Sequence, residues 1–125
     1  MISSAILNAV GDSEMPPMSW NEVVAVHNAQ CGISTKDGKV RSVLCNQAKE
    51  GYADEVQDER IFYRVTSSTN PKSVASLRGM VGLNHTIRVF EKLGVNQWLD
   101  HGEWYVHDCA PEEGGEVFLF TKNRL

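Results

Sequence analysis

Histidine, cysteine and carboxylate side chains near the C-terminus have the types and spacing that could bind a metal ion. His107 and Cys109 are two residues apart, so on a β-strand both would point to one face, as two ligands of a zinc ion could. A third ligand would have to be His101 from a preceding turn, because the sequence contains no second close pair. Structural zinc sites use four ligands. We therefore predict no metal site, and we expect no cofactor.

Asn84 and His85 form a second polar group, directly before the apolar run Thr86–Glu91. Asparagine at a bend often stabilises the turn through its own side chain, and the histidine after it would then only cap the strand. The alternative interpretation is that the pair contacts a ligand or a phosphate group. Both interpretations stay open, and we name Asn84 and His85 as candidate pocket residues.

A hydrolase would combine one of the cysteines with His27, His85 or His101. Such catalysis needs a nucleophile, a base within hydrogen-bond reach and a third, orienting group. The sequence has no nucleophile elbow, phosphate-binding loop or H-E-x-x-H motif. A nuclease would need clustered carboxylates around a divalent ion, and the acidic stretch 50–59 has no matching set elsewhere. We therefore expect a binding protein rather than an enzyme.

Four runs of aromatic and β-branched residues, separated by turn-forming residues, must position these side chains. The runs are Arg60–Thr66, Thr86–Glu91, Gly102–His107 and Glu116–Thr121. Such runs are typical of strands in one sheet or barrel. A further strand is expected at Val40–Cys45 after an Asp-Gly turn signal, and residues 111–115 should form the final hairpin turn. The pattern predicts a small α+β barrel.

The sequence predicts two short helices and one long loop. Ser19 and Glu22 have the spacing of a capping box, so we expect a helix from about Trp20 to Gln30, ended at Gly32. A second short helix is expected over Ser73–Met80. Residues 46–58 are polar and are predicted to be a long surface loop, a type of segment that is usually functional or disordered. We treat residues 1–18 as an N-terminal arm of a single domain spanning 1–125.

Composition limits the class of protein. A chain of 125 residues can bury a core without disulfides or metal, and its three widely spaced cysteines fit reduced thiols. No apolar run approaches the roughly 20 residues needed to span a bilayer, and the N-terminus lacks the basic flank of a secretory signal, so we expect a cytoplasmic protein without membrane contact. The net charge is 12 − 16 = −4, which does not favour non-specific binding to nucleic acid.

Short motifs follow one another from residue 51 onward. They are Gly51-Tyr52-Ala53-Asp54, Phe62-Tyr63 before a polar loop, Asn84-His85, Ile87–Phe90, Gly102-Glu103-Trp104 with Val106, and Val117–Phe120. In order and spacing this series resembles the SRA (SET- and RING-associated, or YDG) domains. It is most similar to the bacterial relatives that accompany HNH nucleases or helicases in restriction systems. The resemblance implies a PUA-like fold, a bent β-barrel with one or two short helices.

The sequence departs from the SRA pattern at two places. The glycine-rich loop that usually follows the tyrosine strand is replaced by residues 64–70, in which Thr69-Asn70-Pro71 is closer to the nuclease-associated relatives. The Tyr-Asp-Gly motif appears as Asp100-His101-Gly102. The chain shows no nuclease, helicase or RING segment, so we expect that any effector activity comes from another protein.

The resemblance implies recognition of a modified base in DNA, held after it is flipped out of the duplex. Extrusion costs a few kcal/mol, which stacking and hydrogen bonds to the base edge offset. In that interpretation Tyr63 is the stacking face, Tyr52 a second wall and Asp54 the reader of the base edge. The resemblance also implies contacts with phosphate or base from Ser67, Ser68, Thr69 and Asn70, and backbone contacts from the cations Arg64, Lys72, Arg78 and Arg88.

Structural interpretations of the same residues stay open. Tyr63 could be an ordinary half-buried strand aromatic, and Tyr52 and Asp54 could decorate a solvated, acidic loop. Our hypothesis is a nucleic-acid recognition module, with modified duplex DNA and an effector protein as partners and a homodimer as an open option. The alternative is a protein-interaction or regulatory module on the same barrel without a base pocket. A hydrolase acting on a small substrate is the third hypothesis.

Overall fold

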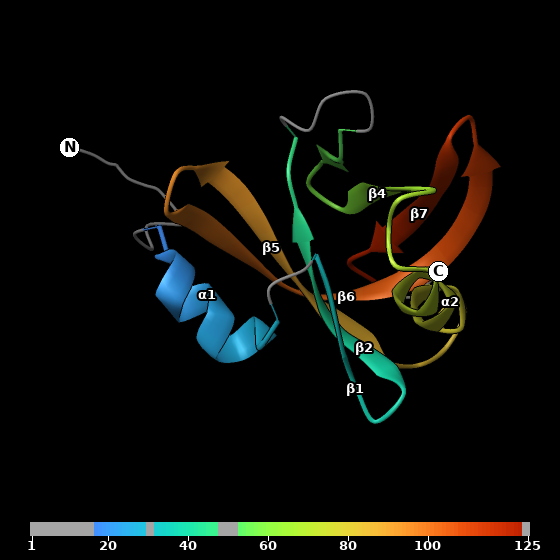
Figure 1. Ribbon diagram of the computed structural model, residues 1–125, viewed down its shortest axis with the longest axis horizontal. Coiled ribbons are helices and arrows are strands. Elements are labelled where there is room, and N and C mark those ends of the chain that lie inside the picture. Colours follow the sequence, from blue (N-terminus) through green and yellow to red (C-terminus); the bar gives the residue numbers. More distant parts are fainter. Residues whose placement is uncertain (1–16, 30–31, 48–52, 124–125) are drawn as a thin grey trace.

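The structure is a computed structural model that describes residues 17–29, 32–47 and 53–123. Two helices and seven strands make up these segments (Figure 1). In chain order they are α1 (Trp20–His27), β1 (Ile33–Lys36), β2 (Lys39–Cys45), β3 (Glu55–Val56), β4 (Arg60–Thr66), α2 (Pro71–Arg78), β5 (Thr86–Gly94), β6 (Gln97–Glu112) and β7 (Gly115–Thr121). Neither helix is long and apolar enough to cross a membrane.

All seven strands belong to one mixed sheet in the order β1-β2-β5-β6-β7-β4-β3. β2 and β5 are parallel, and the other neighbouring strands are antiparallel. This confirms the predicted α+β class. The sheet is bent but is not closed by strand pairing in the described residues, because β1 and β3 remain its two edges. The prediction of a closed barrel is corrected on this point.

Two bulges in β6 contribute to the bend of the sheet. Opposite β5, the pairing passes from Phe90–Asp100 to Val89–Gly102 and leaves His101 as an extra residue. Opposite β7, His107 is the extra residue between Val106 and Asp108. A bulge bends its strand and increases the local twist. The long strand β6 can therefore pair with β5 along one half and with β7 along the other (Figure 1).

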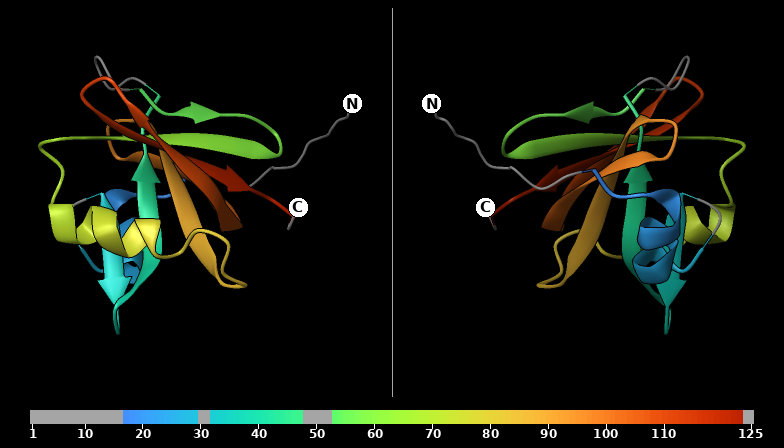
Figure 2. Two further views of the ribbon diagram at one scale, coloured as in Figure 1. Left: turned by 90° about the vertical axis from the view of Figure 1, so that its right-hand side faces the viewer. Right: turned by 90° about the vertical axis from the view of Figure 1, so that its left-hand side faces the viewer.

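The two helices cover opposite faces of the sheet. Val43 and Val89 belong to the main core, which also buries Val74 and Leu77 of α2. The next residue of β5, Phe90, packs instead with Val23 of α1 and with Trp98. Because successive side chains of a strand point to opposite faces, α1 and the main core lie on different sides of β2 and β5. Figure 2 shows α1 beside β2 and α2 beside β1.

Several predicted elements differ in extent from those observed. The capping box at Ser19 and Glu22 is present, but α1 ends at His27, where Asn28 adopts the left-handed conformation (φ 53°). The helix therefore stops well before Gln30, and Cys31 lies outside the described residues. Strand β1 was not predicted, since its four residues are mostly polar. The Asp37-Gly38 turn between β1 and β2 is confirmed, and both residues have positive φ.

Candidate functional site

Asp54 is buried where the end of β2 meets the segment that precedes β3. Only 1% of its surface is exposed. Its Oδ2 accepts a hydrogen bond from the backbone N–H of Asn46 (2.7 Å), and its Oδ1 accepts one from Arg64 (2.8 Å). The backbone N–H of Asp54 donates to the carbonyl of Asn46 (3.2 Å). We call this meeting point the Asp54 junction. The expectation that residues 46–58 form one surface loop is therefore wrong.

Tyr63 lies beside this junction, because Asp54 binds the backbone of the residue that follows it. The alternation of β4 directs Tyr63 into the core, where 4% of it is exposed. One face of its ring stacks on Phe120, with ring centroids 5.6 Å apart and planes inclined by 23°. Its hydroxyl donates to the carbonyl of Gly32 (3.4 Å). The structure thus brings Asp54 and Tyr63 together, whereas Tyr52 lies outside the described residues.

The Arg64 guanidinium stands next to the junction on the other face of β4. It binds Glu55 (2.6 Å), Glu112 (3.1 Å) and the carbonyl of Ala53 (2.9 Å). The hydrogen bond that the guanidinium donates to Glu55 is the largest influence on the pKa of Arg64 and raises it further. Two carboxylates thus already engage Arg64, which weakens its attraction for a phosphate group.

Arg78 and Arg88 are also bound to carboxylates. Arg78 makes a two-pronged ion pair with Glu116, and Arg88 makes one with Asp100. The Arg78 hydrogen bond lowers the pKa of Glu116 below its ordinary value. For Asp100, burial works to raise the pKa, but the hydrogen bonds from Arg88 and from the Gly102 backbone lower it overall. These cations therefore add little positive potential to the surface.

The polar loop 67–70 connects the end of β4 to α2 and is held by its own hydrogen bonds. Thr69 Oγ1 accepts from the Thr66 N–H (3.1 Å), and Ser68 donates its N–H to Thr66 Oγ1 (3.1 Å). Asn70 caps α2 by accepting from the Lys72 N–H (2.9 Å). The side chains of Thr69 and Asn70 thus have local structural roles, and Ser68 contributes its backbone N–H. The Lys72 side chain is exposed and makes no ion pair with any described residue.

Asn84 and His85 are exposed on the connection from α2 to β5. Ser42 pairs with Arg88 in the parallel β2–β5 ladder, and Cys45 pairs with Glu91. His85 therefore lies near the start of this ladder and the Asp54 junction near its end. The structure does not bring Asn84 and His85 together with Asp54 and Tyr63.

A buried polar group, not anticipated from the sequence, lies near the end of the β2–β5 ladder. The carboxylate of Glu91, only 6% exposed, binds the Nε2 atom of His101 (2.7 Å) and the side-chain amide of Gln47 (2.6 Å). Gln47 in turn accepts from the backbone N–H of Val56 (3.5 Å). No sequence motif joins residues so far apart. Within the described residues, no three histidine, cysteine or acidic side chains are grouped as metal ligands.

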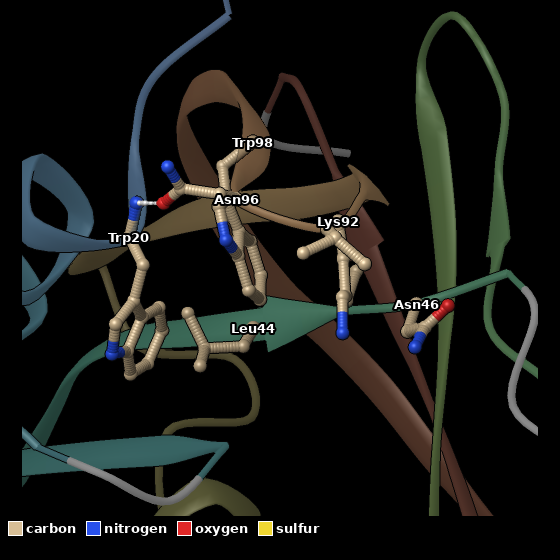
Figure 3. Close-up of a pocket in the computed structure, with 8 residues that line it drawn as sticks. Trp20, Leu44, Asn46, Lys92, Asn96 and Trp98 are labelled. Atoms are coloured by element: carbon tan, nitrogen blue, oxygen red, sulfur yellow. Dashed lines mark hydrogen bonds between the residues drawn. The ribbon is translucent and has the colours of Figure 1, made fainter.

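A cavity of about 400 Å³ lies between the start of α1, the end of β2 and the β5–β6 hairpin (Figure 3). Trp20 and Trp98 line one end, with ring centroids 5.4 Å apart and planes inclined by 36°. Leu44 lies beside the Trp20 ring, and Asn46 and Lys92 lie toward the other end (Figure 3). We call this cavity the tryptophan pocket. Its remaining lining residues are Cys45, Val95 and Asn96.

The β1–β2 hairpin bears basic side chains that form no ion pair with a described carboxylate, although Asp37 lies in its turn. Lys36 and Lys39 are exposed and lie directly opposite each other in the ladder. Like charges in that position destabilise a sheet, so a bound anion would relieve their repulsion. Arg41 follows on β2, and its Nε atom is buried without a hydrogen-bond partner in the described residues. This hairpin is a candidate surface for phosphate contacts.

The arrangement of the sheet and helices is that of the SRA domains. The structure aligns with the modification-dependent TagI restriction endonuclease at a TM-score of 0.65 and 15% identity, over 87% of this chain and 48% of TagI. It aligns with the SUVH5 SRA domain in complex with methylated CHH DNA at a TM-score of 0.62 and 18% identity, over 85% of this chain and 83% of that one.

A third similar structure is KRYPTONITE in complex with mCHH DNA, an H3(1–15) peptide and SAH. Its TM-score is 0.60 at 17% identity, over 86% of this chain and 30% of that one. The protein thus spans about half the length of TagI and less than a third of KRYPTONITE. No protein-family model and no curated protein matches the sequence. At these identities the likeness establishes the fold.

Proposed function

We propose that the protein is a DNA-binding module that recognises a modified base at the Asp54 junction. The observation that most supports it is the buried Asp54 carboxylate, fixed by two backbone N–H groups beside the Tyr63 ring. Carboxylate oxygens accept hydrogen bonds, and the amino group of a base is a donor of the matching kind. The likeness to SRA structures solved with methylated DNA supports the same function.

Tyr63 supplies an aromatic surface to such a base. Phe120 already covers one face of its ring, and only 4% of the residue is exposed, so the opposite face would have to be uncovered before a base could stack on it. Stacking of a base on an aromatic side chain is worth about 1–3 kcal/mol. Tyr52 is proposed as the second wall, as the SRA resemblance implies. The loop that contains Thr69-Asn70-Pro71 is held by its own hydrogen bonds. We propose that Ser68, Thr69 and Asn70 lie close to the backbone of the bound DNA.

The DNA backbone is proposed to contact the β1–β2 hairpin. Lys36 and Lys39 are available there, whereas Arg64 and Arg88 are held by carboxylates. The seven residues of β2 join this hairpin to the Asp54 junction and span about 23 Å at roughly 3.3 Å per residue. That length matches about seven base pairs of duplex at 3.4 Å each, so one DNA molecule can reach both places. We infer that any cleavage or modification of the DNA is done by an effector protein.

Titration of fluorescent duplexes that contain plain, methylated or hydroxymethylated cytosine, at two salt concentrations, tests this function. We expect tighter binding to a modified duplex and weaker binding at higher salt. Asp54→Asn should remove the preference while general affinity persists. Lys36→Gln with Lys39→Gln should weaken binding to all duplexes equally and reduce the salt dependence. Equal affinity of the wild-type protein for all duplexes would refute the proposal.

A protein-interaction module is the second candidate function, and the pairing of the arginines favours it. Arg64, Arg78 and Arg88 are each bound to carboxylates on a chain of net charge −4. Leu83, Leu93 and Val95 are also exposed to 41%, 51% and 90%. This function would be favoured if none of the duplexes binds at low salt.

A further inference from the structure

We propose that the tryptophan pocket is a second nucleotide site, which binds an unstacked base together with its phosphate. The pocket combines two indole rings, two asparagine side chains and one lysine. Its volume of about 400 Å³ falls within the range of roughly 300–1,000 Å³ that is usual for small-molecule sites. The site is distinct from the Asp54 junction, although Asn46 belongs to both.

The aromatic end of the pocket suits a planar ring. Trp98 is 8% exposed and is fixed by backbone hydrogen bonds to Met18 (2.7 and 2.9 Å). Trp20 is half-buried, and its backbone N–H donates to Asn96 Oδ1 (2.7 Å). These bonds fix the backbone of both residues, and the two indole rings contact each other, so less entropy is lost when a ligand binds. Rigid indole faces bind any base, because every base has a π-face.

The polar end of the pocket suits an anion. Among the described residues that line it, Lys92 alone carries a charge, and no described carboxylate pairs with it. Figure 3 shows its ammonium group above β2, between Leu44 and Asn46. A lysine without an acidic partner favours a phosphate as the charged group of the ligand. The side chain of Asn46 also lines this end of the pocket.

An acidic peptide could also place a carboxylate on Lys92, but the two indoles favour a flat aromatic ligand. A nucleotide offers both the aromatic ring and the anion in one small molecule. It can come from a free mononucleotide or from a single-stranded segment of nucleic acid. This site does not need a modified base. Its inference rests on the proposed function only because both sites would bind a nucleotide.

Quenching of tryptophan fluorescence tests the site, with deoxyadenosine monophosphate, deoxyadenosine and a short deoxyadenylate strand as probes. Trp104, 1% exposed, gives a constant background. We expect saturable quenching by the monophosphate and about tenfold weaker binding of the nucleoside, because it lacks the phosphate. Tighter binding of the strand than of the monophosphate would assign the site to nucleic acid, and equal binding would assign it to free nucleotides.

Three variants give the site a matched set of controls. Lys92→Gln should weaken the binding of the monophosphate about tenfold. Lys72→Gln, at another exposed lysine, should leave the affinity for the monophosphate unchanged. Trp20→Leu should weaken the binding of all three probes. Mononucleotide binding and the preference for a modified duplex are measured separately on the wild-type protein, so failure of this site and failure of the modified-base site give different results. The inference is overturned if no probe quenches, or if Lys92→Gln and Trp20→Leu both bind as the wild type does.

Discussion

At the scale of single residues, Asp54 shows how a carboxylate in an acidic stretch can have a structural role. The sequence around it predicts a solvated loop, and the resemblance to SRA domains makes it a reader of the base edge. In the structure it is buried and joins the end of β2 to β4 through two backbone N–H groups. A side chain held in this way has a fixed orientation, which a binding site requires.

Replacing Asp54 by alanine leaves the N–H groups of Asn46 and Arg64 without their acceptor. We expect the free energy of unfolding to fall by about 2–4 kcal/mol, because buried donors lose their partners. Urea denaturation measures this change. Asp58→Ala is the control at an exposed aspartate with no bond to a described side chain and should change the stability by less than about 0.5 kcal/mol. Equal stability of the two variants would show that the junction contributes nothing to folding.

The ion pair of Arg88 and Asp100 predicts a dependence of stability on pH. The pKa of Asp100 is lower in the folded protein than its ordinary value, which is about 3.9 in the unfolded chain. Its stabilisation is therefore complete above the unfolded pKa and is lost as the pH falls through the folded pKa. We expect Asp100→Asn to lower the free energy of unfolding by about 1 kcal/mol at neutral pH, and by progressively less below about pH 4. Urea titrations at several pH values measure this, and a pH-independent difference would contradict it.

At the scale of elements, strand β4 was predictable and the loop before it was not. The alternation in Arg60–Thr66 indicates a strand, and the observed bounds are the same. Residues 46–58 are uniformly polar, and nothing in their pattern shows that Asp54 finds backbone donors in β2 and β4. The ion pairs of the arginines could not be predicted either, because Glu112 is 48 positions from Arg64 and Glu116 is 38 positions from Arg78. Pairing across a sheet depends on register, which local patterns do not encode.

The contact of β4 with β7 depends on Gly115, which pairs with Thr66. A Cβ atom at Gly115 would lie 1.9 Å from the carbonyl oxygen of Val65, and a backbone atom cannot rotate away. We expect Gly115→Ala to lower the free energy of unfolding by at least about 1–3 kcal/mol. Gly79 is the matched control, with φ −68° and its nearest atoms at 3.5 Å. Gly79→Ala should stabilise by about 0.4–1 kcal/mol, and thermal unfolding of both variants measures the contrast.

At the scale of the whole molecule, charge decides which surface can face DNA. The net charge of −4 and the three paired arginines argue against a broad basic face. The unpaired Lys36 and Lys39 instead concentrate positive charge at the β1–β2 hairpin. Affinity would then come from few phosphate contacts, and specificity from the Asp54 junction. This division explains how an acidic domain could recognise DNA without binding all DNA strongly.

Base extrusion into the Asp54 junction is tested most directly with a duplex that carries 2-aminopurine beside the modified cytosine. Removing the cytosine from the stack frees the neighbouring fluorophore, so its emission should rise when the protein binds. We predict a rise in emission with the modified duplex and a much smaller rise with the plain duplex. With Asp54→Asn, the modified duplex should give no larger rise than the plain duplex gives. Binding of the modified duplex without any rise in emission would contradict the account, because the base would then remain inside the helix.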